Sequence, residues 1–291
     1  MKYGLAFANV GPFGQPEGLT HLAQTAERVG VESLWTVEHV AVPIGYESAY
    51  PYSESGKMPG PENSPIPDPL IWLAHASAVT EKIRLCTGIL ILPQRHPIYT
   101  AKELATLDVL SKGRITCGIG IGWLEEEFNS LGIPFARRGA RTEECVRALR
   151  QLWSGDAKPF QGEFYEWNAI ESNPKPVQAG GIPIVVGGHS DGAARRAGRV
   201  GDGFFPMVQG GKIDFDRLGQ LFDVMRAEAE KNGRDPSEIE ITTGAPLRSL
   251  DDAKRLQDLG ISRVVGGPPG FTPEQVTEGL EKLGDEILSK L

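Results

Sequence analysis

Cysteine is scarce in this chain of 291 residues, and the three that occur form no recognisable pattern. Cys86, Cys117 and Cys145 lie in apolar or helical runs without CxxC or Cys/His spacing. A small, odd number of this kind excludes a disulfide framework and predicts reduced, buried thiols in a cytoplasmic protein. Long apolar runs are missing too, since no stretch reaches the ~18–20 residues of a membrane-spanning helix. The N-terminus also lacks the pattern of a secretory signal, so we expect no membrane partner.

An excess of basic residues is absent as well. The formal net charge is −8, with 30 Lys and Arg against 38 Asp and Glu, which disfavours nucleic acid as a partner. There is no P-loop, no GxSxG elbow and no His/Asp set with the spacing of metal ligands. The sequence therefore predicts no metal centre. It favours a reaction on a small organic substrate whose difficult step is carried by an organic cofactor.

What is present is a regular alternation of strand-like and helical patterns. The expected strands are 2–9, 33–37, 83–92, 114–120, 183–187, 202–206, 238–243 and 261–265. The expected helices are 17–30, 69–80, 97–111, 124–131, 140–153, 190–199, 213–232, 251–259 and 273–290. Such alternation is typical of parallel βαβ units. It predicts an α/β fold, a (β/α)₈ TIM barrel formed as one domain by residues 1–291. The alternative is an open doubly wound sheet, but no GxGxxG motif follows the first strand.

Two long segments, 41–67 and 154–180, are expected to be insertions on barrel loops, the second with a small hairpin at 158–171. The first is rich in Pro, Gly, Ser and Tyr. We interpret it as a wall of the substrate pocket with an adaptable lining, and a disordered surface loop is the alternative. The lining candidates are Tyr46, Tyr50, Tyr52 and Met58.

Candidate functional residues lie where strands end, because a barrel places its site at the C-terminal ends of its strands. Glu38 and His39 follow the second strand, and His39 can move a proton or donate to a ring. Gly88 and Ile89 interrupt the third strand, which indicates a bulge or a close approach to backbone. The simpler interpretation of Glu38 and His39 is a polar pair that covers the barrel end. For Gly88 and Ile89 it is ordinary local packing.

Glycine-rich turns follow two further strands. Gly120, Gly122 and Trp123 end the fourth strand, where glycines leave room for something flat against the backbone. Residues 125–127, all glutamate, follow as an acidic helix start with at most one side chain facing inward. After the fifth strand come the cradle candidates for a phosphate at a helix N-terminus, although a capped turn is the alternative. These candidates are Gly187, Gly188, His189 and Ser190.

Together these segments resemble the luciferase-like monooxygenase superfamily, and within it the coenzyme F420-dependent oxidoreductases. The resemblance covers nearly the whole chain. It rests on Glu38-His39 and on the segments 87–114, 118–128, 137–153 and 183–206.

This resemblance implies a barrel whose mouth holds the ring of F420, or of FMN in sister groups. His39 matches the residue that contacts the ring or assists proton transfer. Glu38 stands where some members have Asp. Gly88 and Ile89 match the bulge behind the ring, often with a non-prolyl cis peptide. The other matches are cofactor contacts at Gly120, Gly122 and Trp123, and a phosphate loop at Gly187, Gly188, His189 and Ser190.

The chemistry that the resemblance implies is hydride transfer between F420 and an unidentified organic substrate. The F420 tail would favour basic residues on its path, with Arg95, Arg137, Arg138 and Arg195 as candidates. One alternative is an FMN-dependent monooxygenase that uses reduced flavin and oxygen. The other is a protein that binds a flavin-type cofactor without turnover. Members of the family often form homodimers, and we expect the same here.

Overall fold

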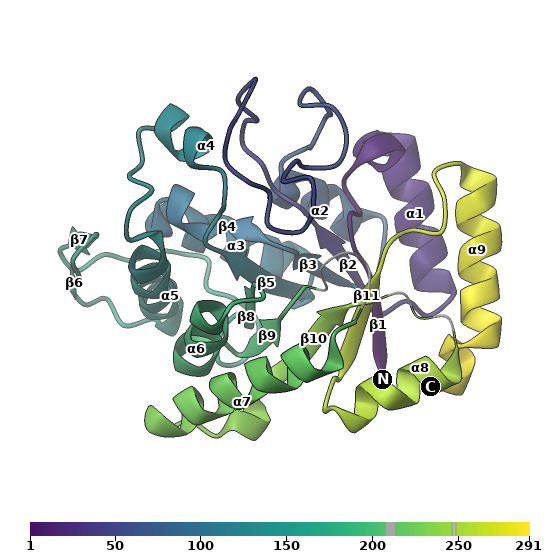
Figure 1. Cartoon of the computed structure of the whole chain (residues 1–291). Helices are drawn as coiled ribbons and strands as arrows, with labels where there is room; N and C mark the ends of the chain where they lie inside the picture. Colours follow the sequence, from purple (N-terminus) through teal and green to yellow (C-terminus); the bar gives the residue numbers. More distant parts are fainter. Residues whose placement is uncertain (208–212, 246, 248) are drawn as a thin grey trace.

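The computed structural model describes residues 1–207, 213–245, 247 and 249–291. Within them, eight parallel strands close into a barrel, as predicted (Figure 1). Each strand pairs with the next, and the pairing of β3 with β5, in which Leu85 lies opposite Ile115, closes the ring. The strands are β1 (Lys2–Leu5), β2 (Ser33–Thr36), β3 (Arg84–Thr87) with its continuation β4 (Leu90–Ile91), β5 (Ile115–Gly120), β8 (Ile184–Gly187), β9 (Gly203–Phe205), β10 (Glu240–Gly244) and β11 (Arg263–Gly266).

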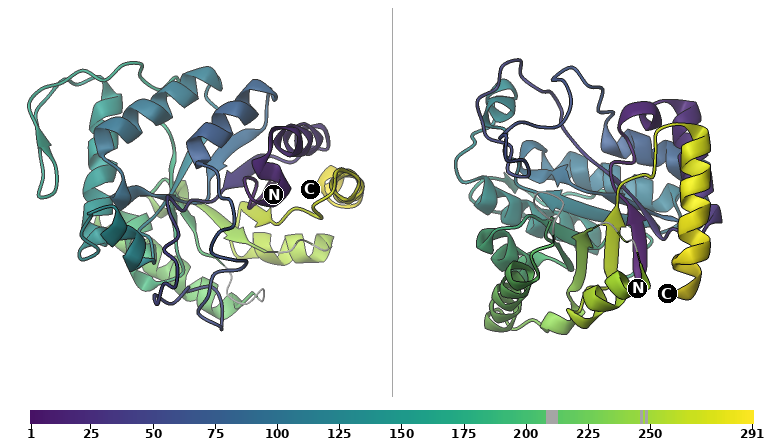
Figure 2. Two further views of the ribbon diagram at one scale, coloured as in Figure 1. Left: turned by 90° about the horizontal axis from the view of Figure 1, so that it is seen from above. Right: turned by 45° about the vertical axis from the view of Figure 1, so that its right-hand side comes forward.

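Helices surround the strands, as the view from above shows (Figure 2). They are α1 (Pro16–Arg28), α2 (Pro69–Ala78), α3 (Pro97–Leu110), α5 (Arg138–Ser154), α6 (Asp191–Val200), α7 (Phe215–Lys231), α8 (Leu250–Asp258) and α9 (Pro273–Glu286), with the short α4 (Glu125–Ser130) after β5. The starts follow local chemistry. Pro97 occupies the first turn of α3, and Thr272 and Gln275 form a capping box on α9.

Most element boundaries fall within a few residues of the prediction, and two strands differ more. The segment 2–9 is extended only to Leu5, and 83–92 is interrupted between Thr87 and Leu90. Both differences lie at the C-terminal ends of strands, where the chain leaves the sheet to build the barrel mouth. The hydrophobic pattern of the sequence does not reveal where the strand ends, because the apolar residues continue beyond that point.

The barrel interior is closed at the end where the strands begin. Arg263, 3% exposed, donates hydrogen bonds to the carboxylates of Glu32 and Glu240. Trp35 and Phe205 pack edge to face above it, with ring centroids 5.2 Å apart. Because this end of the barrel is filled by packed and ion-paired side chains, the opposite end is left for ligands.

The two insertions take different positions. Residues 41–67 rise over the C-terminal ends of the strands, at the top of Figure 1, whereas the second insertion carries the antiparallel pair β6 (Phe160–Gln161) and β7 (Glu166–Trp167) at the side. The hairpin expected at 158–171 is thus confirmed. Its turn is held by the buried Glu144 carboxylate, which accepts the N–H groups of Glu163, Phe164 and Tyr165.

Two further expectations concern the thiols and the membrane. Cys86, Cys117 and Cys145 are unpaired and buried, as expected. Among the described helices, none combines the length and the apolarity needed to cross a membrane.

Candidate functional site

The interruption of the third strand forms the floor of the barrel mouth. The peptide bond between Gly88 and Ile89 is cis, as the family resemblance implies. The Ile89 side chain is half-buried and lies between two glycines of neighbouring strands. An added Cβ on Gly120 would come within 2.7 Å of Ile89 Cδ1, and one on Gly187 within 2.6 Å of Ile89 Cγ2. These glycines therefore make room for Ile89, a partner that the sequence analysis did not identify, and Ile89 presents the surface on which a ligand can lie.

This arrangement predicts a coupled pair of substitutions. Gly187→Ala is expected to lower the free energy of unfolding by about 1–3 kcal/mol, because the new methyl group overlaps Ile89. In an Ile89→Ala background the same change should cost less than about 1 kcal/mol. Urea unfolding of the two single variants and the double variant measures this coupling. Gly192→Ala is the control, since its Cβ would meet only Ser190 Oγ at an ordinary 3.7 Å. Additive costs would refute the assignment.

Glu38 lies behind the Ile89 surface of the barrel mouth. Its Oε2 accepts the Ile91 N–H at 2.5 Å, and its Oε1 accepts two hydrogen bonds from Arg95, at 3.0 and 2.5 Å. Arg95 also pairs with Asp68. Burial lowers the pKa of Arg95, but the Glu38 and Asp68 carboxylates outweigh burial and raise it. The structure thus gives Glu38 the task of holding the chain after the cis bond, and a direct part in chemistry stays a prediction.

The His39 side chain contacts Glu127 of α4. Its Nδ1 lies 3.1 Å from Glu127 Oε2, and Trp123 packs edge to face on its ring at 5.7 Å. Glu127 is fully buried, and its Oε1 accepts the Ala41 N–H at 3.0 Å. The sequence analysis proposed His39 and Trp123 but missed Glu127, which it placed in an acidic helix start.

In the acidic start of α4, Glu127 is the one buried glutamate, within the expected number of at most one. Glu126 remains nearer the surface and binds the first insertion. Glu126 Oε1 accepts the N–H groups of Glu47 and Ser48, at 2.8 and 3.0 Å. The Ser48 hydroxyl and these N–H groups lower the pKa of Glu126 to about 2. Carboxylates of α4 therefore fix the insertion by its backbone.

Aromatic side chains of the insertion reach across the mouth. Tyr46 and Tyr50 pack edge to face on Trp123, with centroids 5.4 and 5.2 Å away. Tyr50 contacts Tyr52, and Tyr52 contacts His189 after β8 at 5.0 Å. Burial, together with Tyr50, raises the pKa of Tyr52 to about 12. We call this series from Trp123 to His189 the aromatic arc. Its ring contacts connect the insertion to the ends of β5 and β8, and the role of a pocket wall stays a prediction.

The turn after β8 leads into the N-terminus of α6. Ser190 caps the helix, its hydroxyl accepting the Ala193 N–H at 3.2 Å. Gly188 has a φ of +125°, and an added Cβ would come within 2.9 Å of Ala193 Cβ. Burial and the nearby Arg217 lower the pKa of His189. Arg217 also binds Asp191, the acidic residue of the first turn, at 2.8 Å. The N–H groups of a helix start and the helix dipole suit an anion here.

Gly122 and Arg138 form a further contact at the mouth. Gly122 has a φ of +74°, and a side chain there would overlap Phe128 and Ile91. Its carbonyl accepts the Arg138 Nε–H at 3.0 Å. Local packing alone therefore favours glycine at position 122, and a cofactor contact there stays a prediction.

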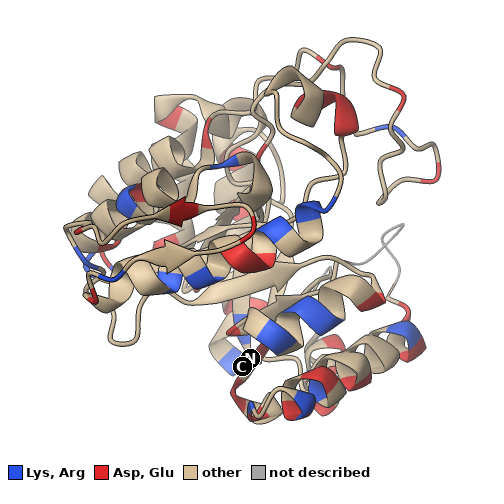
Figure 3. Ribbon diagram, turned by 90° about the vertical axis from the view of Figure 1, so that its left-hand side faces the viewer, with Lys and Arg blue, Asp and Glu red and all other residues tan. Residues whose placement is uncertain are grey.

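Of the four basic residues proposed for a cofactor tail, two form ion pairs: Arg95 binds Glu38, and Arg137 binds Glu163. Arg138 is half-buried and donates to the Gly122 carbonyl. Among these four, Arg195 alone is exposed with no ion pair to another described residue. Figure 3 shows Lys and Arg interspersed with Asp and Glu on the side where α5 and α6 lie.

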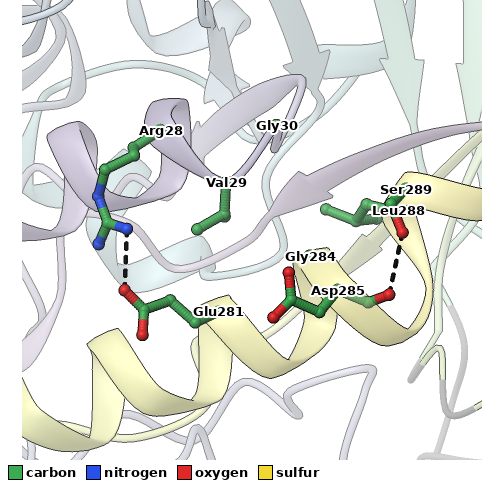
Figure 4. A pocket seen from close by; sticks show the side chains of 8 residues that line it. All are labelled: Arg28, Val29, Gly30, Glu281, Gly284, Asp285, Leu288 and Ser289. Carbon is green, nitrogen blue, oxygen red and sulfur yellow. Dashed lines mark hydrogen bonds and ion pairs between the residues drawn. The ribbon is translucent and has the colours of Figure 1, made fainter.

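A hollow of about 550 Å³ lies far from these residues, between the end of α1 and α9 (Figure 4). Arg28 and Glu281 form an ion pair of 2.8 Å across it. Because helix ends in a barrel meet the starts of the strands, this hollow is at the face that usually serves stability. We assign the candidate site to the mouth instead.

Known proteins are similar to this chain over nearly its whole length. The model of the luciferase-like monooxygenase family matches residues 6–285. The chain belongs to this family. A Mycobacterium tuberculosis relative, "Uncharacterized protein Rv0940c", is 34% identical over 93% of this chain and 94% of its own length.

Two relatives with stated activities use different cofactors. The F420-dependent glucose-6-phosphate dehydrogenase of Kineococcus radiotolerans is 30% identical, over 81% of this chain and 65% of that protein. The FMNH(2)-dependent dimethylsulfone monooxygenase of Pseudomonas putida is 34% identical, over 73% of this chain and 53% of that protein. Relatives of this luciferase-like chain are thus oxidoreductases and monooxygenases.

A solved F420-dependent secondary alcohol dehydrogenase, in complex with an F420-acetone adduct, superposes with a TM-score of 0.78 over 99% of this chain and 98% of that chain. At 18% identity this likeness shows the fold.

Proposed function

We propose that this luciferase-like protein is an F420-dependent oxidoreductase that transfers a hydride between the deazaflavin and a small organic substrate. One observation supports the proposal. Three strand ends at the mouth carry the apolar side chain of Ile89, a glycine turn that leads into the N-terminus of α6 at Gly188–Ser190, and His39. The F420-dependent relative, which aligns with 81% of the chain, supports this choice of cofactor.

The residues present fit such a group. Ile89 offers an apolar surface to a ring, and the aromatic arc can cover the other face and exclude water. The start of α6 offers N–H groups to a phosphate. A bound F420 would supply the hydride chemistry, and the chain's own task is to orient the reactants. His39 then stands where a proton can be taken from or given to the substrate.

Equilibrium titration of the purified protein with F420 and, separately, with FMN tests this proposal. We expect F420 to bind at least about tenfold more tightly, a difference of about 1.4 kcal/mol. Ring fluorescence reports binding of either molecule. A preference for FMN would overturn the proposal. It would support the second candidate, a flavin-dependent monooxygenase, which the FMNH(2)-dependent relative favours. Tight binding without turnover on any substrate would instead support a binding protein.

The expected homodimer stays a proposal. Its support is the outer surface of α2 and α3, where large apolar side chains remain exposed: Ile71 is 75%, Tyr99 73% and Leu110 63% exposed. Exposed apolar surface of this kind often marks a protein interface.

A further inference from the structure

Glu127 is a buried carboxylate at which three segments of the mouth meet. His39 follows β2, Ala41 begins the first insertion, and Gln94 ends the turn after β4. The imidazole Nδ1 lies 3.1 Å from Oε2, and the Ala41 N–H donates to Oε1 at 3.0 Å. The Gln94 side chain, 8% exposed, lies beside the Glu127 carboxylate.

The charge of Glu127 has an unusual partner. No Lys or Arg of the described chain forms an ion pair with it, and its ion-pair contact is with His39. Burial raises the pKa of the Glu127 carboxyl, but His39, the Ala41 N–H and Gln94 outweigh burial and lower it. The group is therefore a carboxylate, which accepts hydrogen bonds and donates none.

A carboxylate at this position determines which imidazole nitrogen carries the proton. Because Glu127 accepts, Nδ1 must donate, so a neutral ring has its lone pair on Nε2. Nε2 has no hydrogen-bond partner among the described residues. Trp123 packs edge to face on the ring and limits its rotation.

We propose that Glu127 is a positioning residue that fixes His39 in the Nδ1–H tautomer and leaves Nε2 as the proton acceptor of the mouth. In catalysis, which rests on the proposed function, a substrate O–H or N–H bond breaks, its proton forms a bond to Nε2, and the resulting imidazolium lies beside the Glu127 carboxylate. In the reverse direction the same proton returns to the substrate.

A purely structural role makes a different prediction. Glu127 could serve only to anchor the insertion through the Ala41 N–H. Glu126, on the same helix, anchors the insertion through two N–H groups and does not contact His39. Glu126→Leu is therefore the matched control for Glu127→Leu.

The tautomer can be read directly by ¹H–¹⁵N NMR of the histidine side chains in the full chain without cofactor, at a pH where the ring is neutral. The chain has 5 His, and His39→Gln identifies the signals of His39. In the wild type we expect the Nδ1–H form to exceed the Nε2–H form by about tenfold or more, as a hydrogen bond to a charged group favours.

The variants separate the two roles. Glu127→Leu should lose the Nδ1–H excess, because no acceptor faces Nδ1, whereas Glu126→Leu should keep it. A wild-type ring with Nε2–H, or a Glu127→Leu ring that keeps the Nδ1–H excess, would overturn the proposal. The wild-type result decides the matter even if the Leu variant does not fold. No cofactor is present, so failure here is distinct from failure of the F420 titration.

Discussion

Glu38→Ala is expected to lower the free energy of unfolding by about 3–5 kcal/mol, the cost of removing one partner from a buried ion pair. The Glu38 side chain is 2% exposed and that of Arg95 16%. Without the carboxylate, Arg95 would keep its charge with only the half-exposed Asp68 and Glu103 nearby. The buried Ile91 N–H would lose its acceptor as well. Chemical denaturation of the purified variant measures the loss.

Glu103→Ala provides the matched control. This carboxylate contacts the same guanidinium, at 3.4 Å, but is 45% exposed, so its loss should cost less than about 1 kcal/mol. Glu38→Gln should fall between the two, because the amide oxygen still accepts one N–H. Equal losses for Glu38→Ala and Glu103→Ala would show that the buried pair does not hold this part of the barrel.

Glu38 illustrates how far the sequence could lead. Its place after the second strand was predictable, because alternating patterns locate strands and a barrel gathers their ends. Its partners were not, since Arg95 lies 57 positions away and meets it only through the closure of β2 against β3. Sequence position placed Glu38 beside His39 as a candidate for chemistry, which stays a prediction, but it could not show the contacts with Ile91 and Arg95.

The glycines show the same limit from another side. Their spacing predicted cleared space at the end of β5 and a phosphate cradle after β8. The side chain next to both Gly120 and Gly187 is Ile89, which comes from a third strand. Likewise, the 88 positions between His39 and Glu127 hid their contact. The available signal was a run of three glutamates directly after a strand end, where an inward carboxylate has a polar neighbour to meet.

The turn after β8 yields the prediction with the largest expected effect on ligand binding. Gly188→Val should weaken F420 binding by about 100-fold or more. Valine is strongly disfavoured at a φ of +125°, and its Cβ would come within 2.9 Å of the Ala193 Cβ. Strain of about 1–3 kcal/mol would be relieved by reshaping the turn. The N–H groups at the start of α6 would then no longer converge on a phosphate.

Two controls separate this effect from general destabilisation. Gly233→Val places valine at another positive φ, +67°, with no atom within 4 Å of the new Cβ, and it lies just beyond the end of α7, away from the mouth. It should lose stability but keep its affinity for F420. Ser190→Ala should cost about 1 kcal/mol of stability through the lost cap, while its backbone N–H groups stay in place and affinity falls only severalfold. Fluorescence titration of variants shown to be folded by circular dichroism gives the affinities. Normal affinity in folded Gly188→Val would remove this turn from the site and leave the anion to be bound elsewhere, with Arg195 as the next residue to test.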